Sequence, residues 1–311
     1  MSRPEYGENI EVFYLVAWTG ERILNPVDLT RRFAESYLRC PAGANHRLTL
    51  IFKGFQNHDQ IAEHCSLFDG AAPSVIEVPD VEQDIGLYRV ALERSGWDLC
   101  CVLNSYSIIC VSGWLADFLR CARDPRVGIV GATGSYESHF SSFVRDPRIR
   151  IVGATGSYRS VFSYGAGRMA GLTAQKHVLR MLRGVAAAVK YWAWFPRFPN
   201  PTIRTNAFMI CRDVFKRVSW PRNPSRGQAL RFESGRRSLT RQVLGMGLDA
   251  VIVGRDGRGY RISEWPSSCT FRQKEQQNLL VADNRTIDYS TAAPERKRQL
   301  AALAWGTYGV E

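Results

Sequence analysis

The stretch "DLCCVLNSYSIIC" (98–110) decides the fold of this chain. It opens with a short apolar run, typical of a buried strand, and then passes into a polar exit. Similar apolar runs precede it at 11–18, 46–55 and 74–80, and a fifth follows at 127–135. Segments with helical periodicity separate these runs. Strands that alternate with helices predict βαβ units and a mostly parallel sheet.

The predicted helices of the first half lie at 26–39, 58–68, 85–96 and 113–124. The second half is mixed: we expect a strand that runs into a helix at 201–215, a helix at 238–247, a strand at 249–257 and a closing helix at 293–305. Because no low-complexity linker interrupts the chain, residues 1–311 are predicted to form one α/β domain, a mostly parallel central sheet flanked by helices with a mixed second half.

Composition and charge narrow the class of protein. The chain has 311 residues, 45% hydrophobic and 23% charged, with a formal net charge of +12. The positive excess predicts a polyanionic contact, which could be nucleic acid, anionic lipid or a phosphorylated substrate. No apolar run is long enough to span a bilayer or to act as a signal peptide, so we expect a cytoplasmic protein. The eight cysteines form no CxxC pair, which favours buried free thiols over a zinc site or disulfides.

A tandem duplication stands out in the middle of the chain. "RDPRVGIVGATGSYES" (123–138) and "RDPRIRIVGATGSYRS" (145–160) are identical at 13 of 16 positions, and only one copy is expected to form a central strand. The "GATGS" loop suggests a dinucleotide fingerprint, but the third glycine of that motif is replaced by Glu137 and Arg159. An NAD(P)-binding oxidoreductase therefore stays an alternative only.

Three segments carry a resemblance to a known family. They are "EQDIGLYRVALERSGWDLCCVLNSYS" (82–107), "TIRTNAFMICRDVF" (202–215) and "RFESGRRSLTRQVLGMGLDAVIV" (231–253). In order and spacing they resemble the family-2-like glycosyltransferases of the GT-A fold. The resemblance implies a nucleotide-sugar-binding half over 11–135 and an acceptor-side half over 201–311.

The chain departs from that family at one motif. The Asp-x-Asp that holds a divalent cation in the family aligns with Asn104-Ser105-Tyr106, which contains no carboxylate. Mg²⁺ or Mn²⁺ requires several anionic or carbonyl oxygens. Arg or Lys side chains could neutralise the donor diphosphate without a metal; otherwise a metal is recruited through other carboxylates, or the activity has been lost. No metal ligand is assigned.

The resemblance also assigns residues to the transfer reaction. An inverting transfer needs a base for the acceptor hydroxyl, and Glu233 is the candidate, in what we expect to be an open loop; its alternative is a helix-capping carboxylate. The predicted donor-binding residues are Ala17, Trp18, Thr19, Lys53, Asp84, Gly86, Arg89, Asn104 and Ser105. The predicted acceptor-side residues are Arg204, Asn206, Arg236 and Trp265, the last as a sugar platform.

We expect Arg204 and Asn206 to alternate along a strand and so to share a face. Trp18 could stack on the donor base or belong to the core, and Asp84 could also cap the helix that follows it. Arg237 and Arg241 could join Arg236 in holding an anion, or lie on a solvated helix face.

The segment 161–200 is basic and ends in "YWAWF". A basic amphipathic helix there would suit a protein resting on an anionic membrane, or a helix packed on the core with a basic edge. The expected partners are a nucleotide-sugar donor and a glycan or lipid-linked acceptor. A nucleic-acid-binding protein is the rival class, although no nucleic-acid-binding module is recognisable.

Overall fold

The computed structural model describes residues 9–17, 25–55, 57–68, 70–78, 84–139, 189 and 191–306. The second copy of the duplication, Trp18 and Thr19 lie outside the described residues. So does nearly all of the predicted basic segment, of which only 189 and 191–200 are described.

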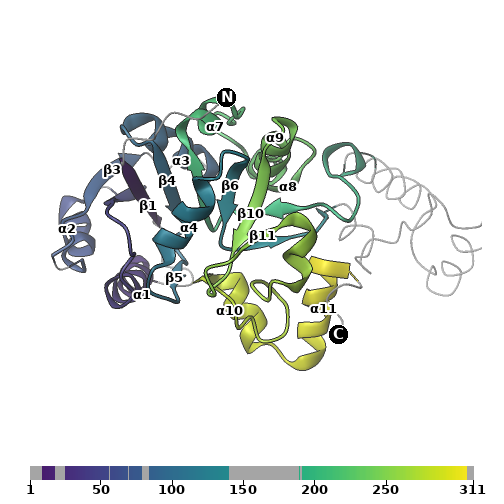
Figure 1. The fold of residues 1–311 in the computed structure, drawn as a ribbon. Coiled ribbons are helices and arrows are strands. Elements are labelled where there is room, and N and C mark those ends of the chain that lie inside the picture. Colours follow the sequence, from purple (N-terminus) through teal and green to yellow (C-terminus); the bar gives the residue numbers. More distant parts are fainter. Residues whose placement is uncertain are drawn as a thin grey trace, which may run out of the picture.

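An eight-stranded sheet forms the centre of the molecule (Figure 1), in the order β11-β10-β6-β9-β4-β1-β2-β3. Its strands are β1 (Ile10–Ala17), β2 (Arg47–Lys53), β3 (Ser74–Val78), β4 (Leu99–Leu103), β6 (Val127–Gly131), β9 (Ala207–Cys211), β10 (Asp249–Val253) and β11 (Gly259–Arg261). Strands β3, β2, β1 and β4 are parallel to one another, and β6 is parallel to β10. Only β9 and β11 run antiparallel to their neighbours. The predicted fold class is confirmed.

Helices cover both faces of the sheet. The helices are α1 (Pro26–Arg39), α2 (His58–Ser66), α3 (Asp84–Arg94), α4 (Trp114–Ala122), α7 (Arg212–Arg217), α8 (Arg226–Ser234), α9 (Leu239–Gly245), α10 (Asn284–Thr291) and α11 (Pro294–Trp305), with a 3-10 helix, η1 (Ile262–Ser267). The loop after α1 accepts hydrogen bonds from the start of α4, and α8 contacts both α3 and α9.

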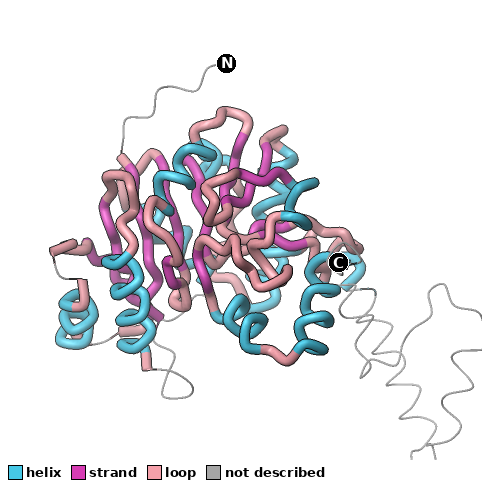
Figure 2. Tube along the Cα trace, turned by 60° about the horizontal axis from the view of Figure 1, so that its bottom comes forward, coloured by secondary structure: helices cyan, strands magenta, loops and turns pink. Residues whose placement is uncertain are grey.

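Two small ribbons complete the fold at the carboxyl ends of the parallel strands. In one, β5 (Ile108–Ile109) pairs with β12 (Val281–Ala282); in the other, β7 (Gly134–Ser135) pairs with β8 (Thr202–Ile203). Figure 2 turns this side of the molecule forward and shows α1 and α10 beside it. The ribbon β5–β12 thereby ties the C-terminal helices to the exit of β4.

The first copy of the duplication forms β6, a central strand between β9 and β10. The turn after it serves packing: a Cβ on Gly131 would lie 2.5 Å from Ile203 Cγ2, and one on Gly134 would lie 2.9 Å from the Trp265 ring. The turn leads into strand β7 rather than into a helix, so it lacks the helix start that a dinucleotide fingerprint uses. Glycine is needed here for close contact between protein segments.

The boundaries of most predicted elements agree with the structure, and α1 matches residue for residue. Two differences affect the site. Glu233 lies in the last turn of α8 and not in an open loop. Arg204 and Asn206 lie in the turn between β8 and β9, so the prediction that they alternate along one strand is wrong.

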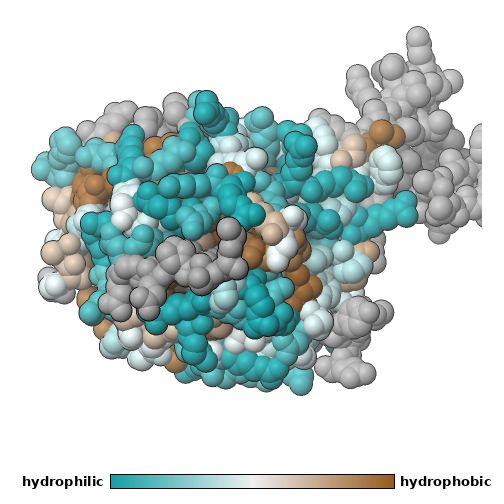
Figure 3. Space-filling view, turned by 45° about the horizontal axis from the view of Figure 1, so that its top comes forward, coloured by the Kyte–Doolittle hydropathy of each residue, from teal (hydrophilic) through white to brown (hydrophobic). Residues whose placement is uncertain are grey.

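Among the residues that the structure describes, no helix combines the length and the apolar character that crossing a bilayer requires. Figure 3, with the amino ends of the parallel strands turned forward, shows a face that is largely hydrophilic, with hydrophobic residues in small patches.

Candidate functional site

The carboxyl ends of the parallel strands gather most of the polar residues that the sequence singled out. Ala17 and Lys53 end β1 and β2, Asn104 and Ser105 follow β4, and Asn206 precedes the antiparallel β9. Ligands of open α/β sheets bind in the crevice outside these ends, so this edge is the candidate site.

The exit of β4 is a tight turn in which several oxygen atoms already accept hydrogen bonds from the protein. Asn104 Oδ1 accepts from the backbone N–H of Tyr106 (3.0 Å) and from Ser107 Oγ (3.1 Å). Tyr14 Oη donates to the carbonyl of Ser105 (2.9 Å). Since these oxygens have protein donors, they are poor ligands for a hard cation, which needs several free oxygens. The residues at this turn do not fit the divalent metal that the family resemblance implies.

Carboxylates from other segments do not supply the missing metal ligands either. In the described part of the chain, no group of three or more His, Cys, Asp or Glu side chains is placed to hold a metal ion. Asp84 and Glu233 are two acidic side chains at this edge, and the charge of Asp84 adds to the burial that raises the pKa of Glu233. Two carboxylates with protein partners of their own do not make a cation site.

Lys53 and Asp84 form the first charged pair of the edge. Their Nζ and Oδ1 atoms are 3.7 Å apart, with the lysine side chain 14% and the aspartate side chain 55% exposed. Partial burial raises the pKa of Asp84, against a lowering effect of the Lys53 charge. The pair lies at the carboxyl end of β2, where Lys53 is the strand neighbour of Ala17 in β1.

Glu233 has the environment of a general base. Thr205 Oγ1 donates to its Oε1 at 2.9 Å. Desolvation by burial raises the pKa of Glu233, while the Thr205 hydrogen bond and the charge of Arg204 lower it. A carboxylate with a raised pKa takes up a proton more readily than an exposed one, which is what a base for a hydroxyl group needs.

Arg204 and Asn206 both contact Thr133, although they do not share a strand. The Thr133 carbonyl accepts from the Arg204 backbone N–H (3.0 Å), and Thr133 Oγ1 donates to Asn206 Oδ1 (3.0 Å). Arg204 also forms an ion pair with the buried Asp283, at 3.2 Å. The turn after β6 therefore fixes the two residues that were predicted for the acceptor side.

Four predicted residues lie away from this centre or are engaged elsewhere. Gly86 is buried inside α3, and Arg89 pairs with Glu93 at 2.9 Å. Arg236 donates to the carbonyl of Trp192. Trp265 is fully buried and donates to the Tyr260 carbonyl, so its ring offers no surface to a sugar.

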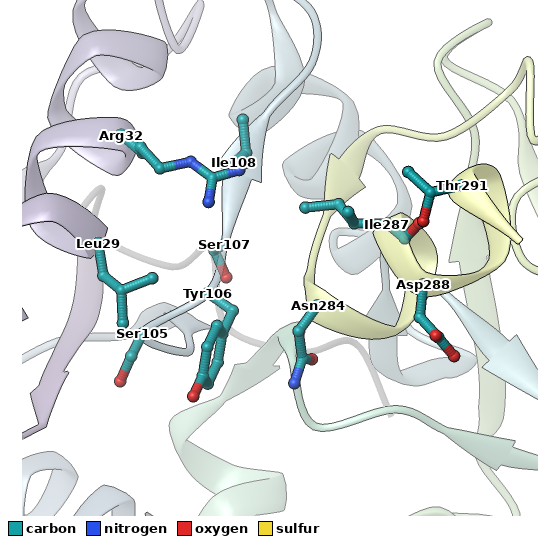
Figure 4. Close-up of a pocket in the computed structure, with 10 residues that line it drawn as sticks. All are labelled: Leu29, Arg32, Ser105, Tyr106, Ser107, Ile108, Asn284, Ile287, Asp288 and Thr291. Carbon is teal, nitrogen blue, oxygen red and sulfur yellow. The ribbon is translucent and has the colours of Figure 1, made fainter. Parts of the chain in front are cut away.

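A groove of about 250 Å³ opens beside the β4 exit (Figure 4). Its floor is Ser105–Ile108, and its walls are α1, which contributes Arg32, and α10, which contributes Asn284 and Asp288. The Arg32 side chain extends from α1 toward Ile108, and Asn284 and Asp288 stand on the α10 side of the groove. Sequence reasoning missed the α10 wall, because its helix is polar and was not recognised.

No family model matches the chain, and no curated protein matches it. Among solved structures, it is similar to a mannosyltransferase from Pyrobaculum calidifontis in complex with GDP-mannose and Mn²⁺: TM-score 0.44, 11% identity, 80% of this chain and 56% of that chain. It is also similar to a CMP:2-keto-3-deoxy-manno-octonic acid synthetase complexed with CTP: TM-score 0.40, 11% identity, 78% of this chain and 88% of that chain.

A third similar structure is glucosyl-3-phosphoglycerate synthase from Mycobacterium tuberculosis in complex with Mg²⁺ and UDP: TM-score 0.30, 13% identity, 40% of this chain and 43% of that chain. The chain thus spans about half the length of the mannosyltransferase. These neighbours are transferases that act with sugar nucleotides or nucleotides. Structural similarity of this degree does not determine the substrate or the reaction. Any inference about either must come from the side chains at the carboxyl edge of the sheet.

Proposed function

We propose that this chain is a glycosyltransferase that moves a sugar from a nucleotide-diphosphate donor to a hydroxyl group of a glycan or lipid-linked acceptor. The observation that carries the proposal is Glu233, a carboxylate with a raised pKa beside Thr205, at the ligand-binding edge of an α/β sheet. The family resemblance of the sequence points to the same reaction.

The residues fall into a donor side and an acceptor side. Over β1 and β2, Lys53 and Asp84 would contact the nucleoside diphosphate, the lysine by its charge and the aspartate by accepting hydrogen bonds.

The groove beside Ser105 has room for a small group such as a sugar unit, since pockets for larger ligands start at about 300 Å³. Its Arg32, Asn284 and Asp288 side chains suit hydroxyl groups.

The reaction needs one proton transfer and one displacement. Glu233 takes the proton of the acceptor hydroxyl, whose oxygen forms a bond to the anomeric carbon. The bond from that carbon to the diphosphate breaks, and the nucleoside diphosphate leaves with the electron pair. The positive charge of Lys53 stabilises the negative charge that develops on the departing nucleoside diphosphate. Attack from the side opposite the leaving group gives inversion.

The proposal also includes a partner of this protein, which is an anionic membrane surface. Val189 is 58% and Trp192 50% exposed, and the guanidinium carbon of Arg236 lies 5.7 Å from the Trp192 ring. An amphipathic helix with an apolar and a basic face rests on anionic lipid, and the proposal assigns these residues to such a face.

The experiment is a thermal-shift panel of UDP, GDP, dTDP, CMP and NAD, each with Mn²⁺ and with EDTA. We expect one nucleoside diphosphate to raise the Tm in EDTA as well, since a ligand at 100 times its Kd stabilises by about 2.7 kcal/mol. Lys53→Met should reduce that shift. The matched control is Lys216→Met, because Lys216 is exposed on α7, at the opposite edge of the sheet. A shift with NAD alone, or equal shifts in both variants, would contradict the proposal.

A further inference from the structure

Two arginines share one aromatic ring beside the acceptor side of the edge. The guanidinium carbon of Arg204 lies 4.4 Å from the centre of the Phe271 ring, and that of Arg272 lies 4.8 Å from it. Each arginine also has a carboxylate partner: Asp283 at 3.2 Å from Arg204 and Glu137 at 3.4 Å from Arg272. The ring and the two carboxylates hold both guanidinium groups in fixed positions.

Both arginine side chains, and the side-chain amide of a neighbouring asparagine, have hydrogen-bond donors that lack acceptors in the described structure. The Nε atoms of Arg204 and Arg272 and the Nδ2 atom of Asn206 are buried and have no hydrogen-bond partner among the residues that the structure describes. Arg272 is 5% and Asn206 4% exposed. Buried donors without partners are costly, and nearly all such groups in folded proteins find an acceptor. Three of them in one region indicate that a ligand with several oxygen atoms completes the cluster.

Arg285 supplies a further positive charge beside the Asp283 carboxylate that pairs with Arg204. It lies at the start of α10, is exposed, and forms no ion pair with any residue that the structure describes. The Arg285 backbone N–H donates to Asp283 Oδ1 at 3.0 Å, and the other oxygen of this carboxylate pairs with Arg204 at 3.2 Å. Arg285 therefore begins α10 beside the Arg204 end of the cluster. Burial lowers the pKa of Arg272, and the charge of Arg285 adds to that effect. Because Arg204 and Arg272 are neutralised by their partners, Arg285 is the excess cation of the cluster.

We propose that Arg285, with the free donors of Arg204, Arg272 and Asn206, binds a phosphate or carboxylate group on the acceptor. The guanidinium group suits both anions, which it can bind with two parallel hydrogen bonds. This inference rests on the proposed function, since it is the transfer reaction that requires an acceptor. The acceptor is accordingly an anionic hydroxyl compound, held by its charged group while its hydroxyl meets Glu233.

The position along the sheet favours the acceptor over the donor diphosphate. Lys53 ends β2, and the Arg204 turn precedes β9, three strands further along the order β2-β1-β4-β9. At a strand spacing of about 4.8 Å, that is roughly 15 Å. The cluster is on the side of Glu233, whose interaction partner Thr205 is the residue next to Arg204. An anion held there lies beside the base and away from Lys53.

The test measures anion binding by the full chain, with inorganic phosphate and with acetate, at constant ionic strength. We expect phosphate or acetate to raise the Tm of the wild-type protein, and the larger shift identifies the anion. Arg285→Ala should abolish the shift and Arg285→Lys should keep part of it. Arg296→Ala, on the exposed side of α11, is the matched control and should leave the shift unchanged. Equal shifts in wild type and Arg285→Ala would overturn the proposal.

A second arm separates this inference from the proposed function. With the nucleoside diphosphate from the thermal-shift panel at saturation, the anion should add its own shift, because the two ligands occupy different places. If the nucleoside diphosphate cancels the shift, the cluster binds the donor and the acceptor assignment is wrong. If no nucleotide binds while the Arg285-dependent shift persists, the transfer function fails and the anion site stands without its assignment to an acceptor.

Discussion

The base role proposed for Glu233 depends on its ionisable carboxylate, which one hydrogen bond and burial influence, and it can be tested by substitution. Glu233→Gln keeps the size of the side chain and an oxygen for Thr205, but removes the proton acceptor. We expect turnover of the nucleotide sugar to fall by about 10²- to 10⁴-fold, the range of general-base catalysis. The Tm should stay within a few degrees of the wild type. Glu295→Gln, on the exposed surface of α11, should leave turnover unchanged.

The pH dependence of turnover gives the same residue a second signature. Glu233 must be ionised to act as a base, so the rate falls as the pH drops through its pKa, which burial raises. Thr205→Val removes a hydrogen bond that lowers this pKa, so the acidic limb of the rate profile should move to higher pH. An unmoved limb would mean that the limb belongs to another group.

At the scale of elements, the turn between β6 and β7 decides between packing and cofactor binding. A Cβ on Gly134 would lie 2.9 Å from the ring of Trp265 and 3.1 Å from Ile252 Cγ2, both within the core. Gly134→Ala should therefore destabilise the protein by about 1–3 kcal/mol, as overpacking does. Gly227→Ala is the control, because a Cβ there meets nothing within 4 Å. Urea unfolding measures both; a stable Gly134→Ala protein with altered NAD binding would restore the dinucleotide interpretation.

The elements themselves were largely predictable, for identifiable reasons. The strands β1, β2 and β4 are buried on both faces and appear in the sequence as short apolar runs between helical patterns. Helix α10 was missed because only Thr286 and Tyr289 of its residues are buried, so it lacks an apolar stripe. Its signal was the capping box, in which Asp283 accepts from the Thr286 backbone and the Thr286 hydroxyl accepts from the Asp283 N–H.

The site was predictable only where strand order determines it. Lys53, Ser105 and Asn206 follow or precede strands, and a parallel sheet brings such residues to one edge whatever their loops do. Arg272 and Arg285 reach the same edge through η1, β12 and α10, after a path that no periodicity describes. Arg272 even has a φ of 49°, a left-handed conformation that is uncommon for arginine.

At the scale of the whole molecule, the polar residues at the carboxyl ends of the parallel strands meet at one edge of the sheet. Two C-terminal segments add charged residues to the same edge. The ribbon β5–β12 joins the exit of β4 to α10, so that the groove and Arg285 depend on the same attachment. In the proposed function, the donor side would draw mainly on the first half of the chain and the acceptor side mainly on the second. The proposed anion site would give the second half its chemical preference.

The stability of the whole fold should fall in mild acid because of one buried histidine. His64 is 1% exposed, its Nδ1 lies 2.8 Å from Thr30 Oγ1, and desolvation lowers its pKa to about 4. An unfolded chain takes up this proton near pH 6.5, whereas the folded chain resists until about pH 4. The free energy of unfolding is therefore not reduced by His64 above pH 6.5. As the pH falls from 6.5 towards 4, protonation of His64 in the unfolded chain lowers the free energy of unfolding by about 3 kcal/mol at most.

Substitution separates this effect from the other titrating groups. His139, whose pKa is also lowered by burial, acts in the same direction, whereas the raised pKa of Glu233 acts in the opposite one. His64→Gln removes one group only, so the slope of unfolding free energy between pH 6.5 and 4 should become shallower than in the wild type. His58→Gln should keep the wild-type slope, because the His58 side chain is 88% exposed. Parallel slopes for the wild type and His64→Gln would show that His64 is not the group that couples this fold to pH.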